Sequence, residues 1–152
     1  MGIQFLDMRI SQDSAADQPG VSLSSSSFPY IFGDIGLQTG GIAPGNASLV
    51  RVTLNAYARL TMAISSNPAI VPDVTFTIFR NSAQIFTTVY QKPASQAMTE
   101  LTYEMAGITA VDFPPAADVL AGQIRYIISV TTNYGVTLGA RSFSGIAVAG
   151  NG

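Results

Sequence analysis

Residues 50–64 read VRVTLNAYARLTMAI, and this stretch decides the fold class. Every even position is apolar, whereas the odd positions between them are mostly polar. Successive side chains of a strand point to opposite faces, so a period of two places the apolar side chains together on one face. The stretch therefore predicts a half-buried antiparallel β-strand. Fifteen residues exceed the usual strand length, so we expect the strand to bend or split near Ala56 and Ala58.

Further segments of alternating character follow along the chain, each bounded by residues that favour turns. The predicted strands cover residues 74–79, 85–90, 99–105, 108–113, 124–130, 136–138 and 143–149. We expect Gly107 to end one strand, residues 139–141 to separate the last two, and residues 116–122 to form a loop. We find no convincing helical period. About eight short strands with turn signals between them predict an all-β fold, an antiparallel β-sandwich of the jelly-roll kind.

The approach to residue 50 contains proline and many glycines. Residues 28–32 (FPYIF) are predicted to be an edge strand, because Pro29 has no backbone N–H to donate to a central ladder. The pairs Gly33–Gly36 and Gly40–Gly41 are interpreted as turns between short strands, since no helix follows that would make them a phosphate-binding loop.

The N-terminal residues differ in character from the rest and form a strand-like extension. Its apolar residues are Ile3, Phe5, Leu6, Met8 and Ile10. Residues 11–20 (SQDSAADQPG) are polar and rich in turn formers, which is typical of a linker. We therefore divide the chain into a connector segment with its linker, residues 1–20, and a jelly-roll domain, residues 21–152. Two alternatives stay open: the segment adds as a strand to a neighbouring subunit, or it returns to its own sandwich as a first strand.

The composition excludes several classes of function. The chain has no Cys and no His, so neither the usual zinc ligands nor a nucleophile–histidine pair is available. Seven scattered cations and a net charge of −2 do not form a phosphate-binding surface, so we expect no nucleic-acid partner. No apolar run approaches the length of a membrane-spanning helix. We expect no enzyme activity, no cofactor and no membrane span.

Two groups of carboxylates come nearest to a chemical site. Glu100 and Glu104 lie on one face of a predicted strand, about 13–14 Å apart, which is too far for glycoside hydrolysis. We expect both to face the solvent. Asp73, Asp112 and Asp118 lie at predicted loop edges, and oxygen ligands suit Ca²⁺, but their spacing does not match an EF-hand loop. Neither group predicts a site, and we expect no metal.

The low charge of the chain points to self-association. Charged residues make up 11% of the sequence, against about 25% in an ordinary soluble domain. A surface with few charges repels neighbouring copies only weakly. This composition is typical of a protein whose surface is largely covered by other copies. The alternative is a monomer with a neutral Thr/Ser surface.

The C-terminal half carries motifs of a known group. Residues 126–130 (YIISV) and the final segment, residues 142–148 (SFSGIAV), resemble the last strands of trimeric jelly rolls of the C1q and tumour-necrosis-factor type. Residues 121–126 (AGQIRY) resemble a strand entry of that group. Residues 74–81 (VTFTIFRN) and 112–116 (DFPPA) are similar to spore-surface jelly rolls of Bacillus-type spore formers, which include exosporium proteins and subunits of endospore appendage fibres.

This resemblance covers about residues 50–149 and implies a homotrimer on a spore surface or otherwise outside the cell. The chain lacks Gly-X-Y repeats, a proline-rich leader and the cysteines that cross-link several appendage subunits. We therefore expect subunits held by noncovalent contacts. The N-terminus has no secretory signal, which is compatible with deposition inside the mother cell.

Two functional hypotheses follow. The first is a structural, self-assembling surface protein: a subunit of a spore- or cell-surface fibre or layer, built from jelly-roll trimers that the N-terminal segments join into head-to-tail filaments. Its partners are copies of itself and other spore-surface proteins. The alternative is a carbohydrate- or receptor-binding head of a cell-surface or phage fibre. That alternative assigns the ligand-facing role to three aromatic residues, Tyr30, Tyr90 and Tyr134.

Overall fold

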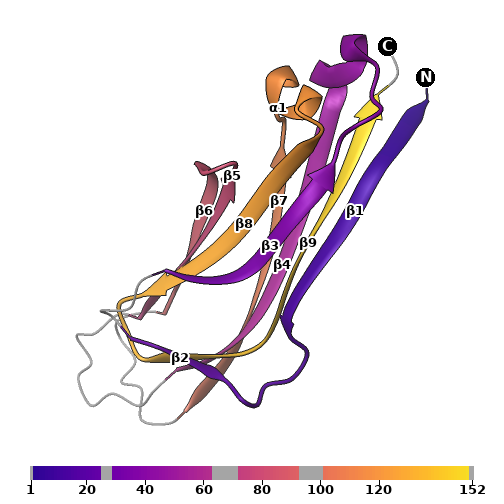
Figure 1. Cartoon of the computed structure of the whole chain (residues 1–152). Coiled ribbons are helices and arrows are strands. Elements are labelled where there is room, and N and C mark those ends of the chain that lie inside the picture. Colours follow the sequence, from indigo (N-terminus) through magenta and orange to yellow (C-terminus); the bar gives the residue numbers. More distant parts are fainter. Residues whose placement is uncertain (1, 25–28, 63–71, 93–100, 151–152) are drawn as a thin grey trace.

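The protein folds into two antiparallel β-sheets packed face to face (Figure 1). The computed structural model describes residues 2–24, 29–62, 72–92 and 101–150. One sheet has the strand order β1-β9-β4-β7, with the short β2 also paired to β9, and the other has the order β3-β8-β5-β6. The predicted all-β antiparallel sandwich is confirmed.

The strands and helices have the following bounds. The first sheet contains β1 (Ile3–Ser14), β2 (Val21–Leu23), β4 (Val50–Met62), β7 (Thr102–Asp112) and β9 (Val136–Gly150). The second contains β3 (Tyr30–Gln38), β5 (Asp73–Arg80), β6 (Ala83–Gln91) and β8 (Gln123–Thr132). A 3₁₀ helix (Pro44–Leu49) and α1 (Ala116–Leu120) lie at the end of the sandwich where both chain ends are found (Figure 1).

β4 is the strand that the alternating stretch predicts. Its even residues are buried and its odd residues face outward, and it pairs with β9 on one side and β7 on the other. Of the expected bend or split near Ala56 and Ala58, the split is wrong, because neighbours on both sides hold β4 extended over all thirteen residues. The only irregularity there is a register shift against β9 between Ala58 and Leu60. Residues 63 and 64 lie outside the described residues.

β9 is a single strand of fifteen residues, so the predicted break at residues 139–141 is wrong. Partners on both edges, β4 on one side and β1 and β2 on the other, keep the backbone extended. Asp17 also packs so closely on Gly139 that a Cβ atom there would meet its carboxylate. The same carboxylate accepts a hydrogen bond from the Ala140 N–H at 3.0 Å. Gly139 therefore serves a close approach and not a turn.

Three further local predictions are corrected. Gly107 lies inside β7, whose ladder with β4 continues through it, and does not end the strand. Residues 116–120 form the short helix α1 and not a loop. Gly33 and Gly36 lie within β3 and not in turns. At Gly33 a Cβ atom would collide with the side chain of Phe143, so this glycine lets the two sheets approach closely. β3 is the edge strand that Pro29 predicts.

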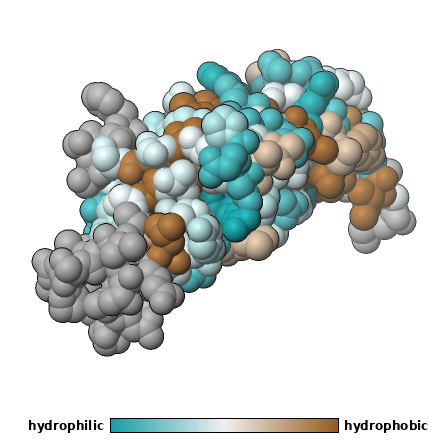
Figure 2. Space-filling view, turned by 90° about the horizontal axis from the view of Figure 1, so that it is seen from below, coloured by the Kyte–Doolittle hydropathy of each residue, from teal (hydrophilic) through white to brown (hydrophobic). Residues whose placement is uncertain are grey.

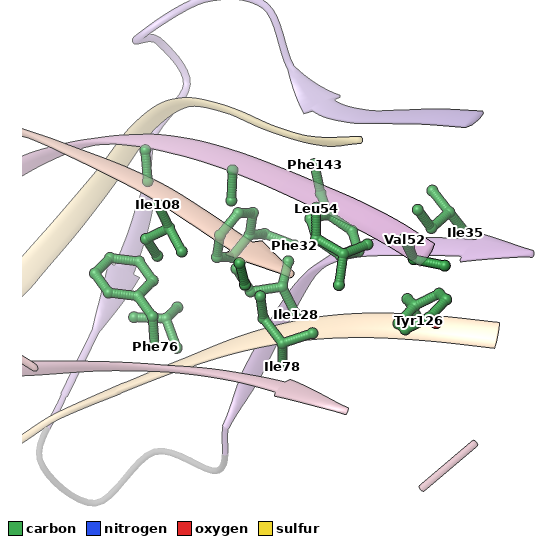
Figure 3. Packing of buried hydrophobic residues seen from close by; sticks show 14 of the residues in the cluster. Phe32, Ile35, Val52, Leu54, Phe76, Ile78, Ile108, Tyr126, Ile128 and Phe143 are labelled. Carbon is green, nitrogen blue, oxygen red and sulfur yellow. The ribbon is translucent and has the colours of Figure 1, made fainter. Parts of the chain in front are cut away.

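The core fills the space between the sheets. Figure 3 shows side chains of the two sheets pointing toward one another. Those labelled are Phe32, Ile35, Phe76, Ile78, Tyr126 and Ile128 from one sheet and Val52, Leu54, Ile108 and Phe143 from the other. Phe32 and Phe76 meet edge to face, with ring centroids 6.1 Å apart. Each such buried side chain contributes about 1.5–3 kcal/mol to stability, so the domain needs no disulfide.

The N-terminal segment lies in the sandwich of its own chain. β1 pairs with β9 from Ile3 opposite Gly150 to Ser14 opposite Arg141. The interpretation of residues 11–20 as a linker is therefore wrong for residues 11–14, which continue the strand. Asp17, farther along, forms an ion pair with Arg59 of β4. The structure of the single chain thus has this segment as a strand of its own sandwich. The alternative, that the segment adds to a neighbouring subunit, stays a prediction.

Candidate functional site

The outer side of the β1-β9-β4-β7 sheet carries an unusual number of exposed apolar side chains. We call this set the apolar face: Ile3, Phe5, Met8 and Ile10 of β1, Ile146 of β9, Tyr103, Met105 and Val111 of β7, and Phe113 directly after β7. Their exposed fractions run from 36% for Ile146 to 79% for Ile3. Some of the hydrophobic residues (brown) gather at the right-hand end of the molecule in Figure 2.

Strand register arranges this face in rows across the sheet. Phe5 lies opposite Val148, which lies opposite Arg51 of β4, and the Arg51 guanidinium is 4.7 Å from the ring centroid of Phe113. The first row is therefore apolar at both edges of the sheet, with one cation between them.

The next rows continue this arrangement. The second row across the four strands consists of Met8, Ile146, Thr53 and Val111. One row farther, Asn55 of β4 accepts a hydrogen bond from the Thr109 hydroxyl at 3.0 Å. Two apolar stripes, one on β1 and β9 and one on β7, thus flank a polar middle stripe on β4.

The apolar face as a whole has about the area of one side of a protein interface. Nine side chains with roughly 100 Å² accessible on each give about 900 Å². The polar stripe of β4 divides this area into two parts, each within the roughly 300–600 Å² of the largest patch on a typical monomer. A standard protein–protein interface buries about 800 Å² per partner. The face is therefore large enough for a stable contact with another macromolecule.

The charges on this face are few and positive. Arg59 is paired with Asp17 and lies 5.3 Å from the ring centroid of Tyr103. Arg51 donates to the backbone carbonyls of Ser48 and Val50, at 3.1 and 2.7 Å. Arg51 is in none of the ion pairs between described residues. A guanidinium that no carboxylate of the described residues neutralises, beside exposed rings, favours a partner surface that offers a carboxylate.

The five connector residues fall into two groups in the structure. Ile3, Phe5, Met8 and Ile10 are exposed on the apolar face, and only Leu6, at a bulge of β1, packs against the core. The intrachain position of β1 thus leaves most of its apolar surface in water. The sequence shows that these residues are too apolar for a free tail, and the structure shows which of them stay uncovered.

The three tyrosines of the alternative hypothesis do not form a common exposed cluster. Tyr134 is only 8% exposed and belongs to the core, so the expectation that it faces the solvent is wrong. Tyr30 is half-buried and donates to the Asp13 carboxylate at 2.7 Å. Tyr90 is half-buried on β6, where burial and a hydrogen bond with Glu104 raise its pKa to about 12. Ligand binding by Tyr30 and Tyr90 stays a prediction.

The carboxylates singled out in the sequence have structural partners. Asp112 accepts two hydrogen bonds from Arg80, at 2.8 and 3.0 Å, and one from the buried Tyr126 hydroxyl at 2.7 Å. Asp118 accepts from the same Arg80 at 3.0 Å. This network connects β5, β7, β8 and α1. The pKa of Tyr126 is raised, mainly by burial and secondly by its hydrogen bond to Asp112.

The remaining carboxylates lie elsewhere. Asp73 accepts from the Gln91 amide at 2.8 Å, away from the Arg80 network. Glu104 was expected to face the solvent, but it is only partly exposed and forms an ion pair with Lys92 at 3.2 Å. Glu100 lies outside the described residues. Among the described residues no group of three or more acidic side chains converges on a common point.

Comparison with known proteins adds information on the fold. No protein-family model and no curated protein sequence matches the chain. Among solved structures the chain is similar to infectious bursal disease virus, Gt strain, with a TM-score of 0.52 and 6% identity over 94% of this chain and 36% of that one. The VP2 subviral particle of the same virus gives a TM-score of 0.51 and 7% identity, again over 94% and 36%.

These similarities define a class of fold and no more. The chain spans about a third of the viral chains it matches. At such low identity the likeness shows that the protein has a jelly-roll fold of the kind found in viral capsid proteins. Within the described residues, no helix is both long enough and apolar enough to cross a bilayer.

Proposed function

We propose that the protein is a structural, self-assembling surface protein, and that its copies associate through the apolar face. The single observation that carries this proposal is the exposure of nine apolar side chains on one side of one sheet. Apolar surface of that extent is costly in water and is removed from it by association. The low charge of the chain supports the same conclusion, since it weakens repulsion between copies.

The finer description of the assembly rests on the sequence. A homotrimer and a place on a spore surface or elsewhere outside the cell come from the resemblance to spore-surface jelly rolls. Joining of trimers by residues 3–10 into a fibre or layer comes from the apolar character of that segment. A role without catalysis is supported by the absence of His and Cys from the sequence.

The experiment measures the oligomeric state by sedimentation velocity at micromolar concentration. The test variant is Phe5→Ser combined with Val111→Ser, which places one polar side chain in each apolar stripe. The matched control is Leu120→Ser on α1, where an apolar side chain is 52% exposed outside the apolar face. Circular dichroism verifies that each variant is folded.

We expect the wild-type protein and the Leu120 variant to form the same oligomer and the double variant to be a folded monomer. A wild-type protein that is monomeric at these concentrations would contradict the proposal. So would a double variant that assembles like the wild type.

A further inference from the structure

The opposite side of the sandwich has an apolar hollow that no sequence motif signals. It lies on the outer side of the β3-β8-β5-β6 sheet and has a volume of about 420 Å³. Its lining residues are Pro29, Ile31, Phe79, Ser82, Ile127 and Ser129. Ile31 at its rim is 52% exposed. A hollow of this size accommodates an aromatic side chain, the kind of residue that most often anchors a protein interface.

A carboxylate stands beside this hollow. Asp34 of β3 is the register partner of Ile127, which lines the hollow. Asp34 accepts two hydrogen bonds from Arg125, at 2.9 and 2.5 Å, and its side chain is 44% exposed. The hydrogen bond from Arg125 lowers the pKa of Asp34, so it is ionised at neutral pH. A carboxylate has about four acceptor positions, so Asp34 can accept further hydrogen bonds beside the two from Arg125.

The apolar face offers the complementary arrangement. Phe113 is 63% exposed just beyond the end of β7, and the guanidinium of Arg51 lies over its ring. An aromatic side chain with an adjacent cation on one face thus matches an apolar hollow with an adjacent anion on the other. The two features lie on opposite outer faces of the sandwich, so they cannot meet within one molecule.

The geometry points to a second copy of this chain as the occupant of the hollow: Phe113 of one copy enters the hollow of the next, and Arg51 of the first meets Asp34 of the second. The inference rests on the proposed function and names the surface that the apolar face contacts. Because different surfaces meet, the contact is heterologous. Repetition produces a ring, such as a trimer, where the rotation closes and an open filament where it does not.

The test uses two variants that each remove one half of the contact. Phe113→Ser removes the aromatic side chain and keeps the hollow, whereas Ile31→Asp makes the hollow polar and keeps Phe113. Both positions are more than half exposed, so both variants are expected to fold, which circular dichroism verifies. Arg51→Glu serves as a second variant that keeps Phe113 and reverses the adjacent charge. Leu120→Ser is the control.

We expect Phe113→Ser alone and Ile31→Asp alone each to weaken association by roughly 100-fold, as for the loss of an interface anchor. The control Leu120→Ser should change the association little. A mixture of Phe113→Ser and Ile31→Asp retains one intact contact. Native mass spectrometry is therefore expected to show a heterodimer with one copy of each variant and no larger species.

The outcomes separate this inference from the proposed function. A monomeric wild-type protein overturns both. A wild-type oligomer that Ile31→Asp leaves unchanged overturns only the inference, and so does a mixture without heterodimers. In those two cases the apolar face contacts some other surface of the second copy.

Discussion

The two open sides of the sandwich are closed in different ways. On the β1/β3 side, polar contacts span the gap between the sheets at several levels. Asp7 of β1 accepts from the Gln38 N–H at 2.9 Å, and Ser11 accepts from the Asp34 N–H at 3.3 Å. At the next level the Asp13 carboxylate accepts a hydrogen bond from the Tyr30 hydroxyl at 2.7 Å. The buried Arg141 of β9 donates to the same carboxylate at 2.5 Å.

The β6/β7 side is held more loosely. Glu104 of β7 contacts two residues here: Tyr90 of β6 and Lys92, which directly follows β6. Between these two strands lies a gap of about 210 Å³ whose lining includes the buried Phe76 and Ile108. The comparison indicates that the N-terminal strand closes its own sandwich on one side, whereas the other side is an edge with few contacts across it.

The largest loss of stability is expected for Arg141→Ala on the β1/β3 side, the closed side of the sandwich. Arg141 is 4% exposed and also donates to the Gly139 carbonyl at 2.6 Å. Removal of one partner of a buried ion pair leaves the other unpaired and costs about 3–5 kcal/mol. We expect urea denaturation to show a loss near the lower limit, because Asp13 retains some exposure. Arg125→Ala, which breaks an exposed pair, is the control and should change stability much less. Equal losses in the two variants would contradict the assignment.

Deletion of residues 2–12 tests the role of β1 as a whole. The half-buried Leu6 and the hydrogen bonds of Asp7 are lost, so we expect a decrease of about 2 kcal/mol in unfolding free energy, read from thermal and urea melts. If β1 served only as a connector between subunits, the truncated protein would keep its stability. Electron microscopy of the same sample tests the connector prediction, since filaments that persist without these residues would exclude it.

Asp7→Asn tests the charge at one end of the β1/β3 side, where Asp7 meets the last residue of β3. The N–H of Gln38 and the guanidinium of Arg9 lower the pKa of Asp7 from its usual 3.8, so the folded state favours the ionised carboxylate. Its stabilisation is present above the unfolded pKa and is lost as the pH falls through the folded pKa. We expect the variant to be about 1 kcal/mol less stable at pH 7 and the difference to shrink as the pH falls below 3.8. A difference that does not vary with pH would contradict this account.

The smallest effect is expected at the loose side. Lys92→Ala removes the ion pair with Glu104, whose side chain is 31% exposed. We expect a loss of about 0.5 kcal/mol in urea denaturation, typical of a pair near the surface. A loss as large as that of Arg141→Ala would show that the two sides contribute equally, and the comparison would fail.

The sequence by itself determined the fold class and the absence of His and Cys. Alternation in β4 and β8 is a local property, because a strand presents one face to the core whichever neighbour it has. The apolar character of residues 3–10 was also visible in the sequence, but not which of these side chains stay exposed. Tyr134 shows the limit of this reasoning, since a tyrosine in a turn reads as exposed until the core around it is known.

Only the tertiary structure decided which strands are continuous and which surfaces stay uncovered. Gly139 and Gly33 resemble turn residues in the sequence, yet each allows a distant group, Asp17 or Phe143, to pack against the backbone. The hollow formed by Ile31, Phe79 and Ile127 comes from three strands far apart in the chain. Such features depend on contacts between remote segments, and the periodicity of any one segment contains no information about them.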